Sequence, residues 1–202
     1  MREPDCYRYF FAFHPDLLLR CWLASLIGTA GQREKRVRAE LFHLTLCVIA
    51  ERRHRDPFIV SRACSALADR PLYSCPFWLG RLRGGQGGAA VHAMGPQDEI
   101  QDFYRMLLAF LASRDILPLY RQSGLHPHVT LDRDPCAIDP LNLPREWFPD
   151  ELLLIESEVG NGVHHVLARW PLLPPRQGRF AFMSPSSPPS SPPQSPIALG
   201  LR

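Results

Sequence analysis

The sequence predicts an α+β fold built on antiparallel sheet. Strand-like segments and segments with helical periodicity alternate irregularly along the 202 residues, and two glycine-containing turns join neighbouring strand-like segments. Such hairpins connect antiparallel strands, whereas a doubly wound parallel fold needs a helix between successive strands. Hydrophobic residues make up 46% of the chain, which is enough for one sizeable core.

In the first 70 residues, two expected strands alternate with two expected helices. The aromatic run YRYFFAF at residues 7–13 has the composition of a strand. Pro15 suits the first turn of a helix, and apolar residues continue at helical spacing to Leu26. Residues 41–49 (LFHLTLCVI) predict a second strand, and residues 58–67 predict a second helix.

The rest of the ordered region contains two hairpins, one helix and one further strand. The hairpins are expected at residues 77–82 with 89–94, around GGQGG, and at residues 151–159 with 163–172, around Gly-Asn-Gly. A strand is expected around residues 126–133. The clearest helix spans residues 97–114, because one side of it forms an apolar stripe of Ile100, Phe103, Leu107, Phe110 and Leu111.

The composition changes near Pro174, after which Pro, Ser and Gly dominate. Such a segment has too few apolar side chains to bury a core. We therefore expect residues 1–173 to form the folded domain and residues 174–202 to form a disordered tail.

The charge balance bears on the kind of partner. Residues 171–202 hold three of the 23 basic side chains and none of the 20 acidic ones, so residues 1–170 are formally neutral. Neutrality argues against a long nucleic acid lying across a broad basic face, but it is compatible with a local basic cleft for one phosphate.

The cysteines and the lengths of the apolar segments indicate the cellular compartment of the protein. The six cysteines form no C-x-x-C pair and have no zinc-like spacing. The sequence shows no signal peptide and no apolar run long enough to cross a membrane. We expect a cytoplasmic protein with reduced thiols, no membrane partner and a monomeric state.

Two tetrapeptides share one pattern, His-apolar-Thr-Leu, at residues 43–46 and 128–131. Side chains alternate faces along a strand, so His43 and Thr45 share one face, as do His128 and Thr130. Only three threonines occur in the chain, and two of them follow a histidine by two positions. Two such copies, both in expected strands, indicate a paired functional site.

The pair suits in-line displacement at phosphorus. One imidazole can activate water on one side of the phosphorus atom, and the other can protonate the departing oxygen on the opposite side. The two threonine hydroxyls can donate hydrogen bonds to the non-bridging oxygens. This chemistry requires neither a metal ion nor a cofactor, and we expect none.

The chain resembles the two-histidine phosphoesterase superfamily, and within it the RNA 2′,3′-cyclic phosphodiesterases often labelled 2′–5′ RNA ligases. RYFFAF resembles the family's first strand, LFHLTL and HPHVTLDRD its two motif regions, and ELLLIESEVG with HHVLARWPL its closing hairpin. The resemblance covers residues 7–172 in order. It implies a bilobal fold in which two pseudo-symmetric antiparallel sheets, with flanking helices, border a central cleft.

The resemblance also implies an activity, the hydrolysis of a 2′,3′-cyclic phosphate at an RNA end to a 2′-phosphomonoester. The expected substrates are RNA ends or cyclic nucleotides. By the family's assignment, His43 donates a proton to the leaving 3′ oxygen and His128 accepts a proton from water. Thr45 and Thr130 hold the phosphate, and Arg133 matches an arginine that often follows the second motif.

Alternatives stay open at this stage. The same histidines can join RNA ends through a 2′–5′ linkage, because the reaction is reversible, or the cleft can bind RNA ends without turnover. Arg133 can instead form a surface ion pair with Asp132 or Asp134. His126 and His128 have the spacing of a metal site, but no third ligand is evident.

Five further histidines have no role in the two motifs. His14, His54 and His92 are expected at the surface or as caps. His164 and His165 stand where the family often carries a tyrosine. Because neighbouring residues of a strand alternate faces, only one of these two can face the cleft.

Overall fold

The structure, a computed structural model, describes residues 3–26, 36–120, 124–134 and 141–175. Its elements in chain order are β1 (Cys6–Phe13), α1 (Leu17–Ser25), a short 3₁₀ turn (Ala39–Leu41), β2 (Leu44–Arg52), α2 (Pro57–Leu67), β3 (Phe77–Gly85), β4 (Gly88–Met94), α3 (Asp98–Ala112), β5 (His128–Asp132), β6 (Leu141–Trp147), β7 (Glu151–Val159) and β8 (Val163–Pro171). The expected tail lies outside the described residues, apart from its first two.

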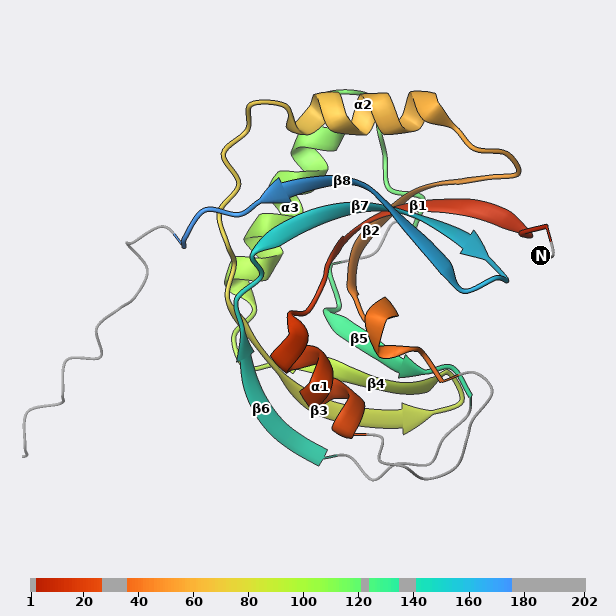
Figure 1. The fold of residues 1–202 in the computed structure, drawn as a ribbon. Helices are drawn as coiled ribbons and strands as arrows, with labels where there is room; N and C mark the ends of the chain where they lie inside the picture. Colours follow the sequence, from red (N-terminus) through yellow and green to blue (C-terminus); the bar gives the residue numbers. More distant parts are fainter. Residues whose placement is uncertain (1–2, 27–35, 121–123, 135–140, 176–202) are drawn as a thin grey trace, which may run out of the picture.

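The strands form one sheet in the order β6-β3-β4-β5-β2-β1-β7-β8, and every neighbouring pair is antiparallel. The predicted α+β class is therefore confirmed. In Figure 1, β1, β7 and β8 lie in the upper part of the molecule, and β3, β4 and β5 lie below them.

Two separate sheets were expected, but the strands are hydrogen-bonded into one. The two four-stranded halves meet where β2 pairs with β5, and a single residue pair, Leu44 with Val129, defines the register there. Both residues are fully buried. The two strands that carry the His-x-Thr motifs, β2 and β5, lie at the inner edges of their halves. The short pairing between them joins the two expected sheets into one.

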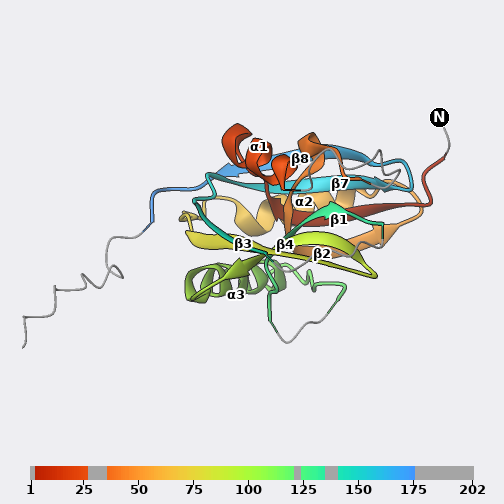
Figure 2. The same ribbon diagram turned by 90° about the horizontal axis from the view of Figure 1, so that it is seen from below.

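The helices begin close to their predicted starts, although Pro15 precedes the cap of α1 and does not lie in its first turn. Asp16 caps α1 by accepting a hydrogen bond from the Leu19 amide at 2.7 Å. Asp56 caps α2 by accepting from two amides, and Pro57 occupies its first position. Helix α3, seen from the side below β3 and β4 in Figure 2, buries most of its predicted stripe in the main core.

Strand β6 was not expected from the sequence. Its segment, LNLPREW, contains Pro144, which lacks a backbone donor and normally argues against a strand. β6 is an edge strand that pairs only with β3, so its outer side forms no ladder in which the proline would leave a gap. The other strands and all three helices agree with their predicted positions to within a few residues.

Two further properties of the described residues bear on the expectations. None of the helices in these ranges is long and apolar enough to cross a membrane. The five described cysteines are free thiols, and two of them, Cys47 and Cys75, are buried in the core.

Candidate functional site

The two His-x-Thr motifs lie on either side of the junction between β2 and β5. Leu44 and Val129, the apolar residues between each His and Thr, are opposite each other and point into the core. In an antiparallel pair, the positions flanking this contact place Thr45 beside His128 and His43 beside Thr130. All four polar side chains therefore lie on one face of the sheet, which we call the site face.

Each motif histidine is held in the same way by the backbone. Nδ1 of His43 lies 2.7 Å from the carbonyl oxygen of Leu41, and Nδ1 of His128 lies 2.8 Å from the carbonyl oxygen of His126. A carbonyl oxygen only accepts hydrogen bonds, so Nδ1 carries the proton in both rings. Each neutral imidazole therefore keeps Nε2 unprotonated, as a proton acceptor, and in the imidazolium Nε2 becomes a donor.

His43 lies one residue before β2, against the apolar part of the site face. Its ring centroid is 5.0 Å from that of Phe10. Phe10 belongs to a small cluster beneath the site, the apolar floor, made of Phe10, Ala12, Val48, Leu153 and Ile155. Burial lowers the pKa of His43 to about 4, and the nearby charges of Arg133 and His128 act in the same direction.

His164 of β8 is the histidine of the closing hairpin that faces the site. Its ring lies edge-on to His43, with centroids 5.1 Å apart, and also contacts Phe10. Burial lowers the pKa of His164 to about 4, with the charges of His43 and Arg133 adding to the effect. His165 points to the other face, where Nε2 lies 3.1 Å from a Glu158 carboxylate oxygen. Strand alternation could show that only one of the two faces the site, but not which one.

His92 of β4 is the neighbour of His128, and the expectation of a surface or capping role for it was incomplete. The two residues are opposite each other in the β4–β5 register, and their rings stack with centroids 5.5 Å apart. Burial lowers the pKa of His92, and the charges of His128, Arg83 and Arg81 lower it further. The sequence held no signal for this contact, because it depends on which strand lies beside β5.

Arg133 follows directly after β5 and is exposed. Within the described residues it forms no ion pair with Asp132 or Asp134. Its positive charge acts to lower the pKa of both His43 and His164. Gly88, at the start of β4, allows this end of β5 to approach: its φ is +97°, and a Cβ there would lie 2.0 Å from the Asp132 carbonyl oxygen.

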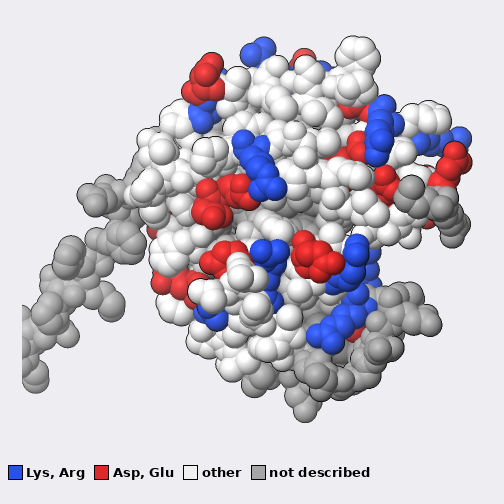
Figure 3. All heavy atoms as spheres, in the orientation of Figure 1, with Lys and Arg blue, Asp and Glu red and all other residues white. Residues whose placement is uncertain are grey.

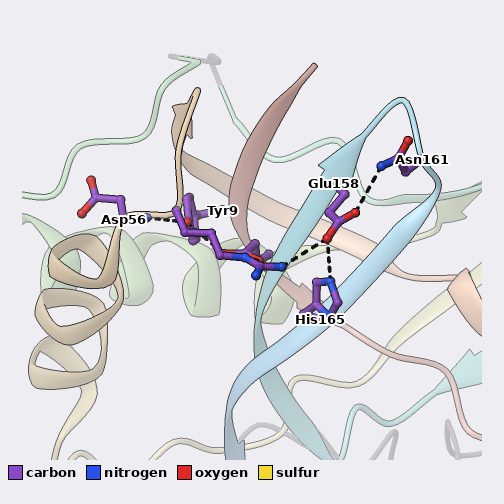
Figure 4. Close-up of polar contacts among 7 residues, drawn as sticks. Tyr9, Asp56, Glu158, Asn161 and His165 are labelled. Atoms are coloured by element: carbon purple, nitrogen blue, oxygen red, sulfur yellow. Dashed lines mark hydrogen bonds and ion pairs between the residues drawn. The ribbon is translucent and has the colours of Figure 1, made fainter. Parts of the chain in front are cut away.

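A polar network on the opposite face holds the β7–β8 hairpin that carries His164 (Figure 4). Tyr9 of β1 donates to Glu156 at 2.9 Å and accepts from the Asp56 amide at 2.8 Å. Arg55 bridges Glu156 and Glu158. Burial and the adjacent Glu156 carboxylate raise the pKa of Tyr9 to about 12, so its hydroxyl stays protonated and remains a donor.

The electrostatics of the site face favour an anion. The strongest charge effects on His43, His92 and His164 come from arginines and other histidines, and none comes from a carboxylate. Figure 3 shows the surface hollowed between the upper and lower halves of the molecule. Among the described residues, no group of three His, Cys, Asp or Glu side chains is arranged to hold a metal ion. Neutral imidazoles, hydroxyls and guanidinium groups are suited to a phosphate.

Comparison with known proteins supports the fold. No family model and no curated protein matches the chain in sequence. The structure of E. coli LigT with 3′-AMP superposes with a TM-score of 0.66 at 21% identity, covering 83% of this chain and 99% of LigT. LigT has also been solved with ATP, with NADP+ and with phosphate.

Two further structures agree. A phosphoesterase superposes with a TM-score of 0.64 at 22% identity, over 83% of this chain and 99% of the other. The protein TT0787 of Thermus thermophilus gives a TM-score of 0.58 at 20% identity, over 82% of this chain and 97% of the other. The chain therefore shares its fold with LigT and with this phosphoesterase, as the resemblance seen in the sequence implied.

Proposed function

We propose that this protein, which shares the fold of E. coli LigT, hydrolyses 2′,3′-cyclic phosphates at RNA ends to 2′-phosphomonoesters. The observation that carries the proposal is the pairing of His43 and His128 on one face of the sheet, each with Nδ1 bound to a backbone carbonyl. Two Nε2 atoms with a defined protonation preference are what acid–base catalysis at one phosphorus atom requires.

The proposed reaction is a single in-line displacement. Nε2 of His128 accepts a proton from water as the water oxygen bonds to phosphorus. The bond between phosphorus and the 3′ oxygen breaks on the opposite side, and the imidazolium form of His43 donates the proton on Nε2 to that oxygen. The products are a 2′-phosphomonoester and a free 3′ hydroxyl. The next turnover requires one proton to return to His43 and one to leave His128.

Three other side chains bind the phosphate in this proposal. The hydroxyls of Thr45 and Thr130 lie on the site face beside the histidines, where they can donate to the non-bridging oxygens. Arg133 supplies a positive charge that acts on His43. The crystal structures of LigT with 3′-AMP and with phosphate support a nucleotide phosphate as the ligand class for this fold.

The same geometry can support 2′–5′ joining of RNA ends, with a ribose 5′ hydroxyl in place of water. His128 would then accept the proton of that hydroxyl, and His43 would again protonate the leaving 3′ oxygen. Water is present at far higher concentration than RNA ends, so we place hydrolysis first. The likeness to LigT and to a phosphoesterase is compatible with both reactions.

We also propose that the protein acts in the cytoplasm. The test is to tag the chain and to measure its distribution among cell fractions.

The test uses a short RNA oligonucleotide ending in a 2′,3′-cyclic phosphate, incubated with a metal chelator and then mapped for phosphate position. We expect the wild type to produce a 2′-phosphate. His43→Ala and His128→Ala should each lower kcat by about 100-fold or more, the usual cost of losing a general acid or base. His54→Ala is the matched control, because His54 is exposed and lies outside the site.

Each other outcome is informative. Wild-type protein that binds the cyclic end without turning it over would identify an RNA-end binding module. Ligated product at micromolar ends would move the joining reaction to first place. Full turnover by His128→Ala would remove the acid–base proposal altogether, because the reaction would then proceed without its proposed base.

A further inference from the structure

A row of basic side chains continues from the second motif across the lower half of the sheet. In the register of β3, β4 and β5, Arg81 is opposite His92, and His92 is opposite His128. One step along, Arg83 is opposite Ala90, which is opposite Thr130. Residues in register share a face, so Arg81, Arg83 and His92 extend the site face away from the reacting groups; we call these three the basic strip.

Neither arginine of the basic strip has a polar partner among the described residues. Within the described residues, neither Arg81 nor Arg83 forms a side-chain hydrogen bond or an ion pair, although Arg81 is half-buried. Many other arginines of the domain are engaged with acids, as Arg55 is with Glu156 and Arg105 with Asp102. A half-buried guanidinium without an acid partner is suited to an anion that arrives from outside.

The charges of the basic strip act on the ring that stacks on His128, one of the two proposed catalytic histidines. The charges of Arg81 and Arg83 reach His92, whose pKa they lower together with burial, and His92 stacks on His128. The other side of the site differs, because His43 and His164 rest there on Phe10 of the apolar floor. Arg133 and Arg38 act on His164 on that side, and the row formed by Arg81, Arg83 and His92 extends positive charge from the second motif along β5, β4 and β3.

The distance between β3 and β5 fits the distance from the reacting phosphate to the preceding phosphates of a nucleic acid strand. Neighbouring strands of a sheet are about 5 Å apart, so the backbone of Arg81 or Arg83 lies roughly 10 Å from that of β5. A side chain at that distance cannot easily share the phosphate held between His43 and His128, but it can reach a phosphate one or two nucleotides before it. Arginine binds phosphate oxygens in pairs, which suits a backbone that passes over the sheet.

We infer that Arg81, Arg83 and His92 form a second phosphate site, which binds the backbone of an RNA strand upstream of its reacting end. The identity of the reacting end rests on the proposed function, whereas binding of the strand does not. Two consequences follow. The enzyme discriminates against cyclic mononucleotides in favour of oligonucleotides, and this discrimination depends on salt concentration because phosphate contacts release counterions.

The experiment compares the double variant R81A/R83A with the wild type. Binding of a fluorescent RNA octamer that ends in a 2′-phosphate is measured by anisotropy against salt concentration. We expect the variant to bind roughly ten-fold more weakly at low salt and to lose about 1.4 units from the slope of log Kd against log salt, as for two phosphate contacts on a single strand. The control R105A removes an exposed charge from α3, away from the site face.

Turnover provides the second readout. The cyclic-phosphate octamer and a 2′,3′-cyclic mononucleotide are compared as substrates of both proteins. We expect R81A/R83A to lose about ten-fold more kcat/KM on the octamer than on the mononucleotide. The variant R81K/R83K should recover the salt-dependent part of the loss, because the charge is restored, but not the part due to the paired hydrogen bonds that only arginine makes.

The outcomes separate the two proposals. Octamer binding that depends on Arg81 and Arg83 without any turnover would support the basic strip and overturn the proposed hydrolysis. Turnover of both substrates with no extra loss on the octamer would leave the hydrolysis standing and overturn the strip. Wild-type binding of the octamer by R81A/R83A would also overturn it.

Discussion

At the scale of single residues, the protonation of His43 is the central question. Burial lowers its pKa to about 4, so its ring is neutral near pH 7. The donor role requires the opposite state. A phosphate anion beside the ring stabilises the imidazolium and raises the pKa, so substrate binding would charge the acid.

We therefore predict that phosphate binding raises the pKa of His43 from about 4 toward neutrality. The measurement is an NMR titration of the His Cε1–H signals with and without saturating inorganic phosphate, with His43→Gln used to assign the resonance. An unchanged pKa in the complex would exclude His43 as the donor and make it the base, with His128 as the acid.

At the scale of elements, the β3–β4 turn positions the end of the second motif. Gly88 has a φ of +97°, and its backbone passes so near β5 that a Cβ would lie 2.8 Å from the Cα of Arg133. The φ value alone disfavours any other residue, and the contact adds a steric clash. The glycine-rich turn therefore matters for the placement of a phosphate ligand as well as for the hairpin.

Gly88→Ala should lower the free energy of unfolding by about 1–3 kcal/mol, the cost of a strained backbone position, and reduce kcat/KM through the shift of Arg133. Denaturant unfolding and turnover measure the two effects. Gly87→Ala in the same turn is the control, because a Cβ there meets no heavy atom within 4 Å. Equal stability of the two variants would show that the close approach is not required.

The polar network of Figure 4 is a second feature at this scale, because its hydrogen bonds and ion pairs connect β1, β7 and the segment before α2. Tyr9→Phe removes the hydroxyl that serves both Glu156 and the Asp56 amide. We expect a loss of about 1–3 kcal/mol in the free energy of unfolding, because the Asp56 amide and one oxygen of the buried Glu156 carboxylate each lose a hydrogen bond. Tyr7→Phe on the same strand is the control, since it retains the ring that contacts Arg55. Similar denaturation midpoints for the two variants would contradict this role.

At the scale of the whole molecule, the site affects stability as a function of pH. His43 and His164 titrate near pH 4 in the folded protein and near 6.5 in the unfolded chain. Between these values the unfolded chain binds more protons, so stability rises with pH there. The contribution of both groups is fully present above about pH 6.5 and is lost as the pH falls toward 4.

We predict that the wild type is markedly less stable at about pH 5 than at about pH 7.5, and that His164→Gln reduces this difference. Urea unfolding at both pH values measures it, with His54→Gln as the control at an exposed position. A pH dependence in His164→Gln that matches the wild type would show that His164 is not held neutral by the fold.

Much of the fold and the core of the candidate site could be predicted because they depend on local patterns. The period of two along β2 and β5 placed His and Thr on one face and the intervening Leu44 and Val129 in the core. The glycine turns and the stripe of α3 were equally local signals. Strand β6 was missed because its Pro144 is acceptable only at a sheet edge, and edge position is a property of the assembled sheet.

By itself, the sequence determined which residue types alternate on each strand, where the chain turns and which two motifs share one pattern. Only the tertiary structure decided that β2 and β5 pair, that His164 and His92 flank the two motif histidines, and that Arg81 and Arg83 continue the same face. The physical reason is that strand pairing and desolvation depend on residues far apart in the chain. The register of a neighbouring strand and the burial of a ring cannot be read from the residues beside it.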